Sequence, residues 1–361
     1  MQKKVLRVKI ILIAFTLILL GIIMVYSTTS ISSWQIKGDS EFYFKRQLLY
    51  FFIGFILSGF ALLLDLDFLR RYSKVLILIG LVSLICVFLP HIGRQAGGAK
   101  RWLSLKGFNI QPSEFCKLFL ILYYADYLCR KKNKIKDFKE GILAPLLITA
   151  LYSFLIILEP DFGQAIFVFL IFLFMFYIGR AKFKHLLFIV LVGLIFFLIF
   201  SFSSQYRAKR LLVFLNPWKD PKGAGYQLVQ AHLALGRGGL LGKGLGKSIH
   251  KLYYLPAAHT DFIFAIIGEE LGFLGCSCVI FLYLLFFFYS LKLIKFIKDE
   301  FSYYLAWGCV LNLILQAQIN MGVVLGVLPT KGLPLPFVSY GGSSLICSML
   351  SLGLFLNASK N

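Results

Sequence analysis

The sequence predicts an all-α polytopic membrane protein with about ten transmembrane helices and a large extracytoplasmic loop between helices 7 and 8. Two observations support this prediction. Hydrophobic residues make up 59% of the 361 residues and charged residues only 15%, whereas soluble chains carry roughly 25% charged residues. Apolar runs long enough to cross a bilayer as a helix recur along the whole chain, so residues 1–361 form one integral membrane domain.

Ten segments satisfy the length requirement approximately. The expected spans are 8–28, 46–64, 74–90, 113–129, 142–158, 162–179, 184–202, 262–290, 302–325 and 341–358. The fifth and sixth are joined only by Leu-Glu-Pro-Asp, which predicts a tight helical hairpin with Pro160 in the first turn of the sixth helix.

The distribution of basic residues predicts the orientation of these spans. If the N-terminus lies in the cytoplasm, the cytoplasmic termini and short loops contain more Lys and Arg than the short outer loops, as the positive-inside rule requires. Both termini are then cytoplasmic. The long outer loop, residues 203–261, contains many Lys and Arg but only Asp220 and Asp261 as acids. Because the chain carries a net charge of +22, an anionic ligand outside the membrane is the simplest explanation for this loop.

Several function classes are disfavoured. The basic residues lie in short clusters between apolar runs, unlike the single soluble face of a nucleic-acid-binding protein. The seven cysteines include no CxxC pair, so neither a disulfide framework nor a zinc site is indicated. Gly246-Lys247-Ser248 does not complete a P-loop, because Leu241 occupies the position of its first glycine. No internal repeat is visible, which weakens a transporter interpretation.

Two outer segments contain bases that are suited to a phosphate. Lys100 and Arg101 precede Trp102, and the alternative is an interface tryptophan beside two surface bases. Lys243 and Lys247 lie in a glycine-rich run whose exposed N–H groups also suit a phosphate, although this signal is nonspecific.

The few acids near the outer surface are the second set of candidates. At the hairpin tip, Asp161 is expected either to cap the sixth helix or to act in a site. Glu159 ends an apolar helix, where its charge opposes the helix dipole, so we expect a cation partner, either a base of the long loop or a divalent ion.

Charged residues inside the spans should be paired or functional. Lys117 lies one turn inside the fourth span and is expected to pair with a carboxylate such as Glu114, three residues earlier. Glu269 and Glu270 lie about 12 to 14 Å along the eighth span from Asp261 and are expected to be functional or paired, for example with Lys117.

Asp261 opens the eighth span and has two interpretations. As a helix cap it would be ionised with a low pKa. If Thr260 provides the cap instead, Asp261 is free to serve as a general base or metal ligand, with possible support from His259. Downstream, three prolines in 328–344 preclude a continuous helix, so this stretch is expected to be an ordered re-entrant segment whose apolar residues line a path for lipid tails.

Taken together, these motifs resemble the SEDS family of bacterial cell-wall proteins (FtsW, RodA and SpoVE) over nearly the whole chain. The matching segments are 98–102, 111–114, 159–163, 226–228, 259–264, 269–272 and 332–344. Residues 251–256 and 328–332 are closer to the cell-division branch of this family than to the elongation branch.

The resemblance implies a SEDS fold and a peptidoglycan glycosyltransferase that polymerises lipid II at the outer face of the bacterial plasma (inner) membrane. It implies Asp261 as the base of an inverting displacement, and cations for the departing undecaprenyl pyrophosphate. The substrate-binding candidates are Lys100, Arg101, Trp102, Arg207, Arg210, Lys243, Lys247 and Lys331. The supporting candidates are Glu114, Lys117, Glu159, Asp161, His259, Thr260, Glu269, Glu270 and Ser339.

The resemblance also implies partners and leaves alternatives open. The expected partners are lipid II, a class B penicillin-binding transpeptidase, other divisome proteins and the lipid bilayer, with no nucleic acid. A divalent cation, Mg²⁺ or Mn²⁺, is a possible cofactor. The alternative functions are an elongation polymerase of the RodA type, a lipid II flippase and a noncatalytic divisome scaffold.

Overall fold

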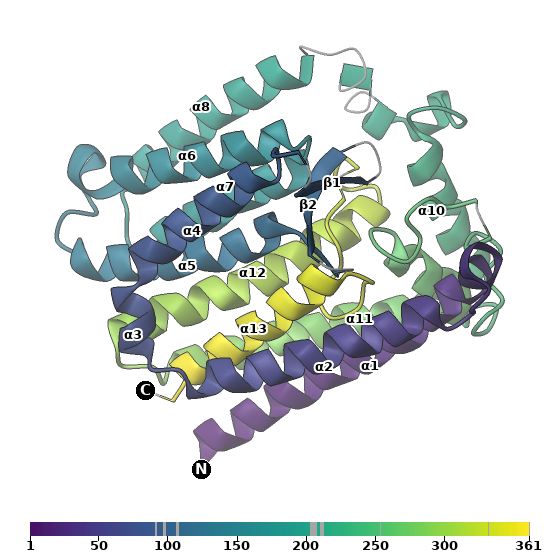
Figure 1. Cartoon of the computed structure of the whole chain (residues 1–361), viewed down its shortest axis with the longest axis horizontal. Helices are drawn as coiled ribbons and strands as arrows, with labels where there is room; N and C mark the ends of the chain where they lie inside the picture. The colour runs from purple at the N-terminus through teal and green to yellow at the C-terminus, as the bar shows by residue number, and fades with distance from the viewer. Residues whose placement is uncertain are drawn as a thin grey trace.

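The structure, a computed structural model, describes residues 1–90, 92–96, 99–105, 108–202, 208–209, 213–252, 254–330 and 332–360. Long helices lie side by side in one bundle (Figure 1). They are α1 (Gln2–Lys37), α2 (Phe42–Leu63), α4 (Ser73–Cys86), α5 (Pro112–Arg130), α6 (Leu143–Leu158), α7 (Phe162–Ile178), α8 (Phe183–Phe202), α11 (Ile263–Ile294), α12 (Glu300–Val324) and α13 (Gly342–Ala358). Each of the expected spans coincides with one of these helices.

The composition of these helices is that of a multi-pass membrane protein. In the described part of the chain, 6 helices are long and apolar enough to cross a membrane: α1, α2, α6 with the turn before it, α8, α11 and α12. The shorter helices α4, α7 and α13 are also apolar. Helix α5 differs because it carries Glu114, Lys117 and Asp126, and all three of these side chains are buried within the bundle.

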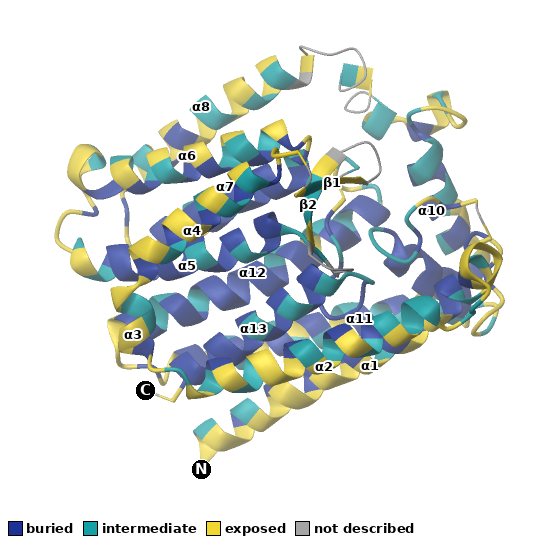
Figure 2. Ribbon diagram, in the orientation of Figure 1, coloured by how far each residue is buried: buried dark blue, intermediate teal, exposed yellow. Residues whose placement is uncertain are grey.

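Burial separates the core of the bundle from its lipid-facing rim. Helix α12 has 72% of its most apolar stretch buried inside the protein, whereas α8 has only 11% buried and lies at the edge beside α7. Figure 2 shows the same contrast, with buried residues concentrated in α12 and α13 and exposed residues on α2 and α8. The polar residues of the central helices are therefore shielded from lipid, which makes the bundle interior the place to seek a site.

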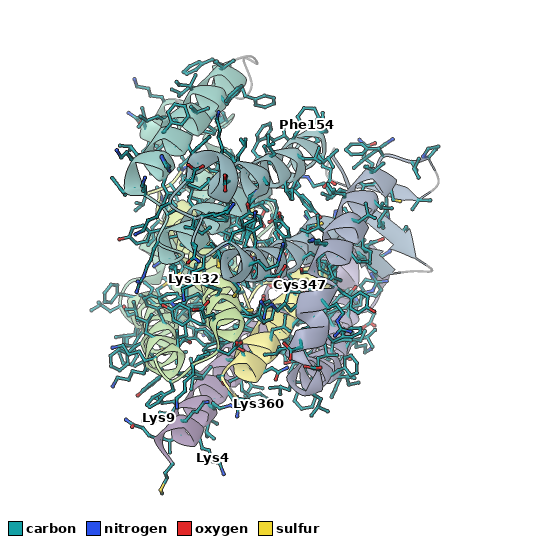
Figure 3. The ribbon with its side chains drawn as sticks, turned by 90° about the vertical axis from the view of Figure 1, so that its left-hand side faces the viewer. Lys4, Lys9, Lys132, Phe154, Cys347 and Lys360 are labelled. Carbon is teal, nitrogen blue, oxygen red and sulfur yellow. The ribbon has the colours of Figure 1, made fainter. Side chains whose placement is uncertain are left out.

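Both termini and several lysines lie at one end of the bundle. Figure 3 views the molecule from that end, where Lys4, Lys9, Lys132 and Lys360 are seen. The ends of the chain also meet there, because Nζ of Lys3 donates to the carbonyl oxygen of Lys360 at 2.9 Å. This arrangement agrees with the expected concentration of positive charge on one side of the membrane.

Short elements occupy the connections. Next to the long helices lie α3 (Leu66–Arg71), the π-helical turn η1 (Phe138–Ile142), the 3-10 turn η2 (Pro217–Lys219) and α10 (Tyr226–Gly238). Helix α10, which belongs to the long loop, packs along α11. The segment 325–341 contains no helix in its described residues, as its prolines predict.

An antiparallel sheet in the loop before α5 was not expected from the sequence. Strands β1 (Gly93–Ala96), β2 (Ala99–Leu105) and β3 (Phe108–Ile110) follow one another in order, with Leu103 of β2 opposite both Gly93 and Ile110. The pairing of β1 with β2 shifts register here, because Arg94 is opposite Trp102 and Gln95 is opposite Lys100, so Arg101 is the extra residue of a β-bulge. A bulge interrupts the regular alternation of side chains, and it lies at the two bases that were expected to bind phosphate.

Two local expectations are wrong. Pro160 is not in the first turn of the sixth span, because α7 begins at Phe162 with Asp161 as its N-cap, which leaves Pro160 in the turn. The apolar residues of the proline-rich segment do not line a path for lipid tails, since Leu333, Leu335 and Phe337 are at most 2% exposed and pack within the core. These apolar residues of the segment are therefore part of the protein core.

Candidate active site

Asp261 lies just before α11 and is held by residues that are distant in sequence. Nδ2 of Asn320, on α12, donates to the carbonyl oxygen of Asp261 at 2.8 Å and to that of Leu333 at 2.6 Å. One amide group therefore joins the start of α11 to the proline-rich segment. The side chain of Asp261 is half-buried rather than sealed under packed helices, so it remains accessible.

Ser339 and Tyr340 complete this junction. Oγ of Ser339 donates to the carbonyl oxygen of Thr260 at 2.5 Å and accepts a hydrogen bond from the backbone of Leu335 at 2.8 Å. The backbone N–H of Tyr340 donates to the carbonyl oxygen of His259 at 2.9 Å. Ser339 therefore lies where a supporting residue was expected, and its role is to fix the backbone on either side of the site.

The capping interpretations of Asp261 and Thr260 are both wrong. The N-cap of α11 is Phe262, and no side chain caps the helix. The hydroxyl of Thr260 instead donates to the carbonyl oxygen of Ala257 at 3.3 Å. The carboxylate of Asp261 is consequently not used in capping.

The pKa of Asp261 is raised, not lowered as a capping role would require. Its pKa is raised to about 6, mainly by burial and in part by the nearby carboxyl group of Asp161, while the charge of Arg101 opposes the shift. At neutral pH the side chain is therefore mostly ionised and more basic than an ordinary aspartate. A pKa near the operating pH suits a general base.

Arg101 joins the β-sheet to the hairpin between α6 and α7. Its Nε donates to the carbonyl oxygen of Glu159 at 3.1 Å, and its Nη2 donates to that of Pro160 at 2.5 Å. Its Nη1 lies 3.5 Å from Oδ2 of Asp161, whose Oδ1 accepts the N–H of Gln164 at 3.3 Å. Asp161 is thus a helix cap, and Arg101 places this acid within electrostatic range of Asp261.

Glu159 has a carboxyl group without a hydrogen-bond partner among the described residues, although the residue is 0% exposed. Its pKa is raised to about 8, mainly by burial and in part by the neighbouring Asp161, while the charge of Arg101 opposes the shift. The expected ion pair with a base is not found in the described part of the chain, because Arg101 binds the backbone carbonyl of Glu159 instead of its carboxylate. Glu159 is therefore mainly protonated at neutral pH.

A buried polar network lies beside this hairpin. Nζ of Lys117 is 2.8 Å from Oε2 of Glu114 and 2.8 Å from Oε1 of Gln316 on α12, and Nε2 of Gln316 donates to the carbonyl oxygen of Pro334 at 2.9 Å. Gln164 also donates to Glu114. The expected pairing of Lys117 with Glu114 is confirmed, and the network holds the proline-rich segment against the central helices.

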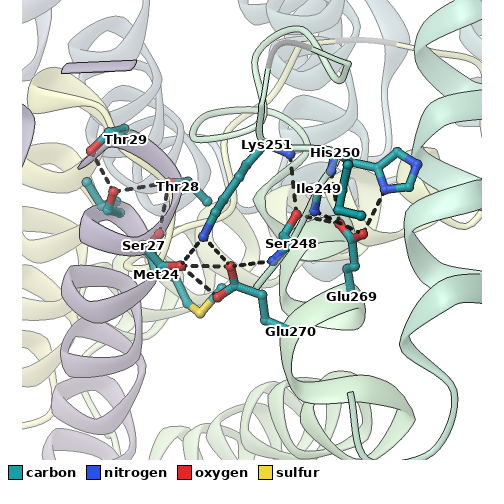
Figure 4. A network of polar contacts seen from close by, with 11 residues as sticks. Met24, Ser27, Thr28, Thr29, Ser248, Ile249, His250, Lys251, Glu269 and Glu270 are labelled. Atoms are coloured by element: carbon teal, nitrogen blue, oxygen red, sulfur yellow. Dashed lines mark hydrogen bonds and ion pairs between the residues drawn. The ribbon is translucent and has the colours of Figure 1, made fainter. Parts of the chain in front are cut away.

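Glu269 and Glu270 are paired with the long loop rather than with Lys117. Nζ of Lys251 lies 2.7 Å from Oε1 of Glu270, which also accepts the hydroxyl of Ser27 at 2.8 Å (Figure 4). Nδ1 of His250 lies 2.9 Å from Oε1 of Glu269. These pairs attach the loop to α1 and α11, so the expectation that the two acids are paired is confirmed, although their partners are Lys251 and His250 rather than Lys117.

The two glutamates lie at an interruption of α11. Gly272 has φ 68° and ψ −165°, which frees the backbone groups on either side of it. The N–H of Lys243 donates to the carbonyl oxygen of Glu269 at 3.0 Å, and the N–H of Phe273 donates to that of Gly239 at 2.8 Å. Residues 239–244 therefore take up the hydrogen bonds that the helix loses there.

The remaining candidates for the pyrophosphate are dispersed. Lys100 is exposed on β2, and Trp102 beside it is half-buried. Lys243 and Lys247 are exposed near the interruption of α11, eight or more residues along that helix from Asp261. Three candidates, Arg207, Arg210 and Lys331, lie outside the described residues.

His259 does not contact the carboxylate of Asp261 among the described contacts. Its ring lies 5.7 Å from that of Tyr43 and 5.6 Å from that of Tyr340. Burial lowers the pKa of His259 to about 4, so the ring is neutral at pH 7. Its role is to pack α2 against the segment around Tyr340.

Asn320, Gln316 and Gly332 are site residues that the sequence analysis missed. Gln316 and Asn320 are four residues apart on one face of α12, and Asn312, a further four residues earlier, is also buried on that face. Three amides at this spacing in an apolar helix are a signal that could have identified them. Gly332 carries no such signal, because its importance depends on what approaches it in space.

Comparisons with known proteins find relatives over nearly the whole length of this chain. The family described as "Cell cycle protein", FTSW_RODA_SPOVE, matches residues 7–361. A probable peptidoglycan glycosyltransferase FtsW from Geobacter sp. (strain M18) is 41% identical over 97% of this chain and 95% of its own. Stage V sporulation protein E from Bacillus subtilis (strain 168) is 38% identical over 97% of this chain and 96% of its own.

Solved structures show the same fold. A chain of a structure titled "Structural coordination of polymerization and crosslinking by a peptidoglycan synthase complex" matches with a TM-score of 0.79, 26% identity, and 97% and 96% coverage of the two chains. The rod shape determining protein RodA of Thermus thermophilus matches with a TM-score of 0.69, 26% identity, and 97% and 95% coverage. Because the family model spans nearly the whole sequence and the helices superpose over nearly the whole fold, this chain belongs to the FtsW/RodA/SpoVE family.

Proposed function

We propose that this protein is a peptidoglycan glycosyltransferase that polymerises lipid II at the outer face of the bacterial plasma membrane, with Asp261 as the general base. The enzyme class follows from the family and from the names of its relatives. One observation carries the assignment of the base. The carboxyl group of Asp261 is half-buried, takes no part in helix capping, and has a pKa raised to about 6.

The proposed reaction is a single displacement with inversion. The donor sugar is α-linked to undecaprenyl pyrophosphate, and the product linkage is β-1,4, so the acceptor hydroxyl attacks the anomeric carbon from the opposite side. Asp261 accepts the hydroxyl proton as the new C–O bond forms. The bond between the anomeric carbon and the pyrophosphate oxygen breaks, and its electron pair leaves with the pyrophosphate. The proton on Asp261 passes to water after the product is released.

Stabilisation of the departing pyrophosphate requires a cationic side chain that is not already bound to other groups of the protein. The guanidinium group of Arg101 binds the hairpin at Glu159, Pro160 and Asp161. Lys100 is exposed and has no ion pair among the described residues. We therefore assign the direct contact with pyrophosphate to Lys100 and a positioning role to Arg101, and we retain Arg207, Arg210 and Lys331 as further candidates.

The described residues do not form a complete site for a divalent cation. No group of three His, Cys, Asp or Glu side chains in this part of the chain is arranged to hold a metal. The buried carboxyl group of Glu159 makes no hydrogen bond among the described residues, and its raised pKa favours the protonated form, which is a poor metal ligand. We propose that Mg²⁺ or Mn²⁺, where required, accompanies the pyrophosphate of the substrate.

The proposal extends to location and partners. Apolar helices support a multi-pass membrane protein, and the lysines at the end with the termini support a cytoplasmic location for that end. A similar chain in a structure titled as a peptidoglycan synthase complex supports a class B transpeptidase as partner. Similarity to FtsW and stage V sporulation proteins supports a role at the septum with other divisome proteins.

The test of this function is polymerisation of labelled lipid II by the full-length protein with its transpeptidase partner in detergent, with and without chelator. Asp261→Asn keeps the size of the side chain and removes the base, so polymer synthesis should be lost while partner binding is retained. Glu41→Gln, an exposed acid outside the site, should have normal activity. Polymer synthesis at the wild-type rate by Asp261→Asn would exclude the proposed base.

The same variant distinguishes the alternative functions. A lipid II flippase reconstituted in liposomes would move labelled lipid equally well with Asp261→Asn, and a noncatalytic scaffold would form no polymer in either form. The division and elongation roles are separated by localisation of the tagged protein, because a septal enzyme concentrates at the division site.

A further inference from the structure

A groove on the rim of the bundle lies between α4, α5 and α6, away from Asp261. Its volume is about 420 Å³, which is within the range of small-molecule binding sites. The walls include Leu78 and Leu81 of α4 and Ile148 of α6. This part of the groove is suited to a hydrocarbon chain.

One end of the groove is polar. Lys74, in the first turn of α4, and Arg130, the last residue of α5, both line it. Lys74 is exposed and has no ion pair among the described residues. Arg130 is paired through Nε with Asp126 at 2.8 Å, but Asp126 is also bound by Arg70 at 3.4 Å. The one acid is therefore shared by two guanidinium groups, and an excess of positive charge remains at this end.

Tyr123 adds a hydrogen-bond donor to the polar end. Its side chain lines the groove and is 6% exposed, yet its hydroxyl has no hydrogen-bond partner in the part of the chain that the structure describes. The neighbouring Tyr127 differs, because its hydroxyl donates to the carbonyl oxygen of Glu140 at 3.2 Å. The hydroxyl of Tyr123 is not sealed within the protein, so it is available to donate to an acceptor of a ligand in the groove.

We propose that this groove binds one anionic phospholipid from the surrounding membrane. Its acidic headgroup contacts Lys74, Arg130 and Tyr123, and one acyl chain lies along Leu78, Leu81 and Ile148. The order of these residues matches a lipid in a bilayer, because Lys74 is at the end of α4 nearest the termini and Leu81 lies about 10 Å further along the helix. The inference does not depend on the catalytic role of Asp261.

Native mass spectrometry of the full-length protein tests this proposal. The probes are phosphatidylglycerol and phosphatidylcholine with identical acyl chains, added to the delipidated protein in detergent. We expect phosphatidylglycerol to bind and phosphatidylcholine to bind much more weakly. Lys74→Gln should lower the affinity for phosphatidylglycerol about fivefold, the factor for ~1 kcal/mol per cation near an anionic lipid surface. Tyr123→Phe should lower it by a similar factor.

The controls separate this site from general charge effects. Lys136→Gln removes an exposed lysine outside the groove and should leave the affinity unchanged. Leu81→Trp should fill the groove and prevent binding while the charges remain. Equal binding of the two lipids, or wild-type affinity in both Lys74→Gln and Tyr123→Phe, would overturn the proposal. So would competition by millimolar glycerol phosphate, since that would show a site for the phosphate group alone.

Discussion

Gly332 packs so closely on Asp261 that a Cβ atom at position 332 would lie 2.7 Å from Oδ2 of the carboxyl group. This contact connects the proline-rich segment directly to the proposed base. Because the atom that must move is the end of a short side chain rather than backbone, Gly332→Ala should displace the carboxylate at little cost in folding stability.

We expect Gly332→Ala to lower the rate of lipid II polymerisation by about tenfold to 100-fold, the scale of a displacement near 1 Å at a reacting group. Its thermal unfolding temperature should stay close to that of the wild type. Gly59→Ala, on α2 with no atom near the added Cβ, is the matched control and should retain activity. Normal activity in Gly332→Ala would show that the position of this carboxylate is not critical.

The rate of polymerisation should depend on the ionisation of Asp261. Burial raises its pKa to about 6, and the base acts in its deprotonated form. The rate at subsaturating lipid II should therefore rise with pH through about 6 and level off above 7. An initial-rate profile from pH 4.5 to 8 measures this, with partner binding followed over the same range. A profile that is flat through pH 6 contradicts the assignment.

Glu159 should make the protein less stable as the pH rises. Its pKa is about 8 in the folded protein and near 4.5 when unfolded, so the folded state binds more protons between these values. Stability is then highest below about pH 4.5 for this group and declines towards pH 8. Glu159→Gln imitates the protonated form, and its unfolding temperature should decline less between pH 5 and 8. Identical pH dependence in the two proteins would show that Glu159 does not hold this proton.

The pair formed by Lys117 and Glu114 is buried, since the two side chains are 1% and 2% exposed. Removal of one partner leaves an uncompensated charge, so Lys117→Met should destabilise the protein by roughly 3 to 5 kcal/mol. The double variant Lys117→Met/Glu114→Gln should recover much of this loss, because neither charge remains. Unfolding in detergent measures both. Equal destabilisation by the single and the double variant would mean that the loss does not come from the unpaired carboxylate.

Lys100 and Arg101 should behave differently although they are adjacent. Lys100→Ala should reduce polymerisation and leave the unfolding temperature unchanged, since the side chain is exposed. Arg101→Ala should reduce both, because it removes the contacts of β2 with Glu159, Pro160 and Asp161. If Arg101→Ala is as stable as the wild type and only binds substrate less well, the positioning role is incorrect.

Much of the bundle could be predicted because its signal is local. Bilayer thickness fixes the length of a membrane-spanning helix, so the apolar runs of α1 and α12 are each sufficient to predict that those helices span the bilayer. The pairing of Lys117 with Glu114 was also predictable, because the helix places residues three apart on one face. The β-sheet at 93–110 was not, since its strands are short and obtain their partners only from one another.

The candidate site was predictable in its residue types but not in its geometry. Asp261 and Asp161 stand out in sequence as acids at the ends of spans, and Arg101 as a base in an outer loop. Their relation depends on the hairpin being bound by Arg101 and on the contacts of Asn320 and Ser339 with the loop before α11. Those contacts join residues more than 50 positions apart, and no local pattern encodes them.

The sequence by itself determined the membrane location, the helical class and the identity of the acid that is proposed to react, because hydrophobic length and charge are properties of each segment alone. The tertiary structure decided the pKa of Asp261, the binding of Arg101 to the hairpin and the burial of the Glu159 carboxyl group. These properties arise from desolvation and from charges that other helices bring near, and both depend on distances that exist only after the helices have packed.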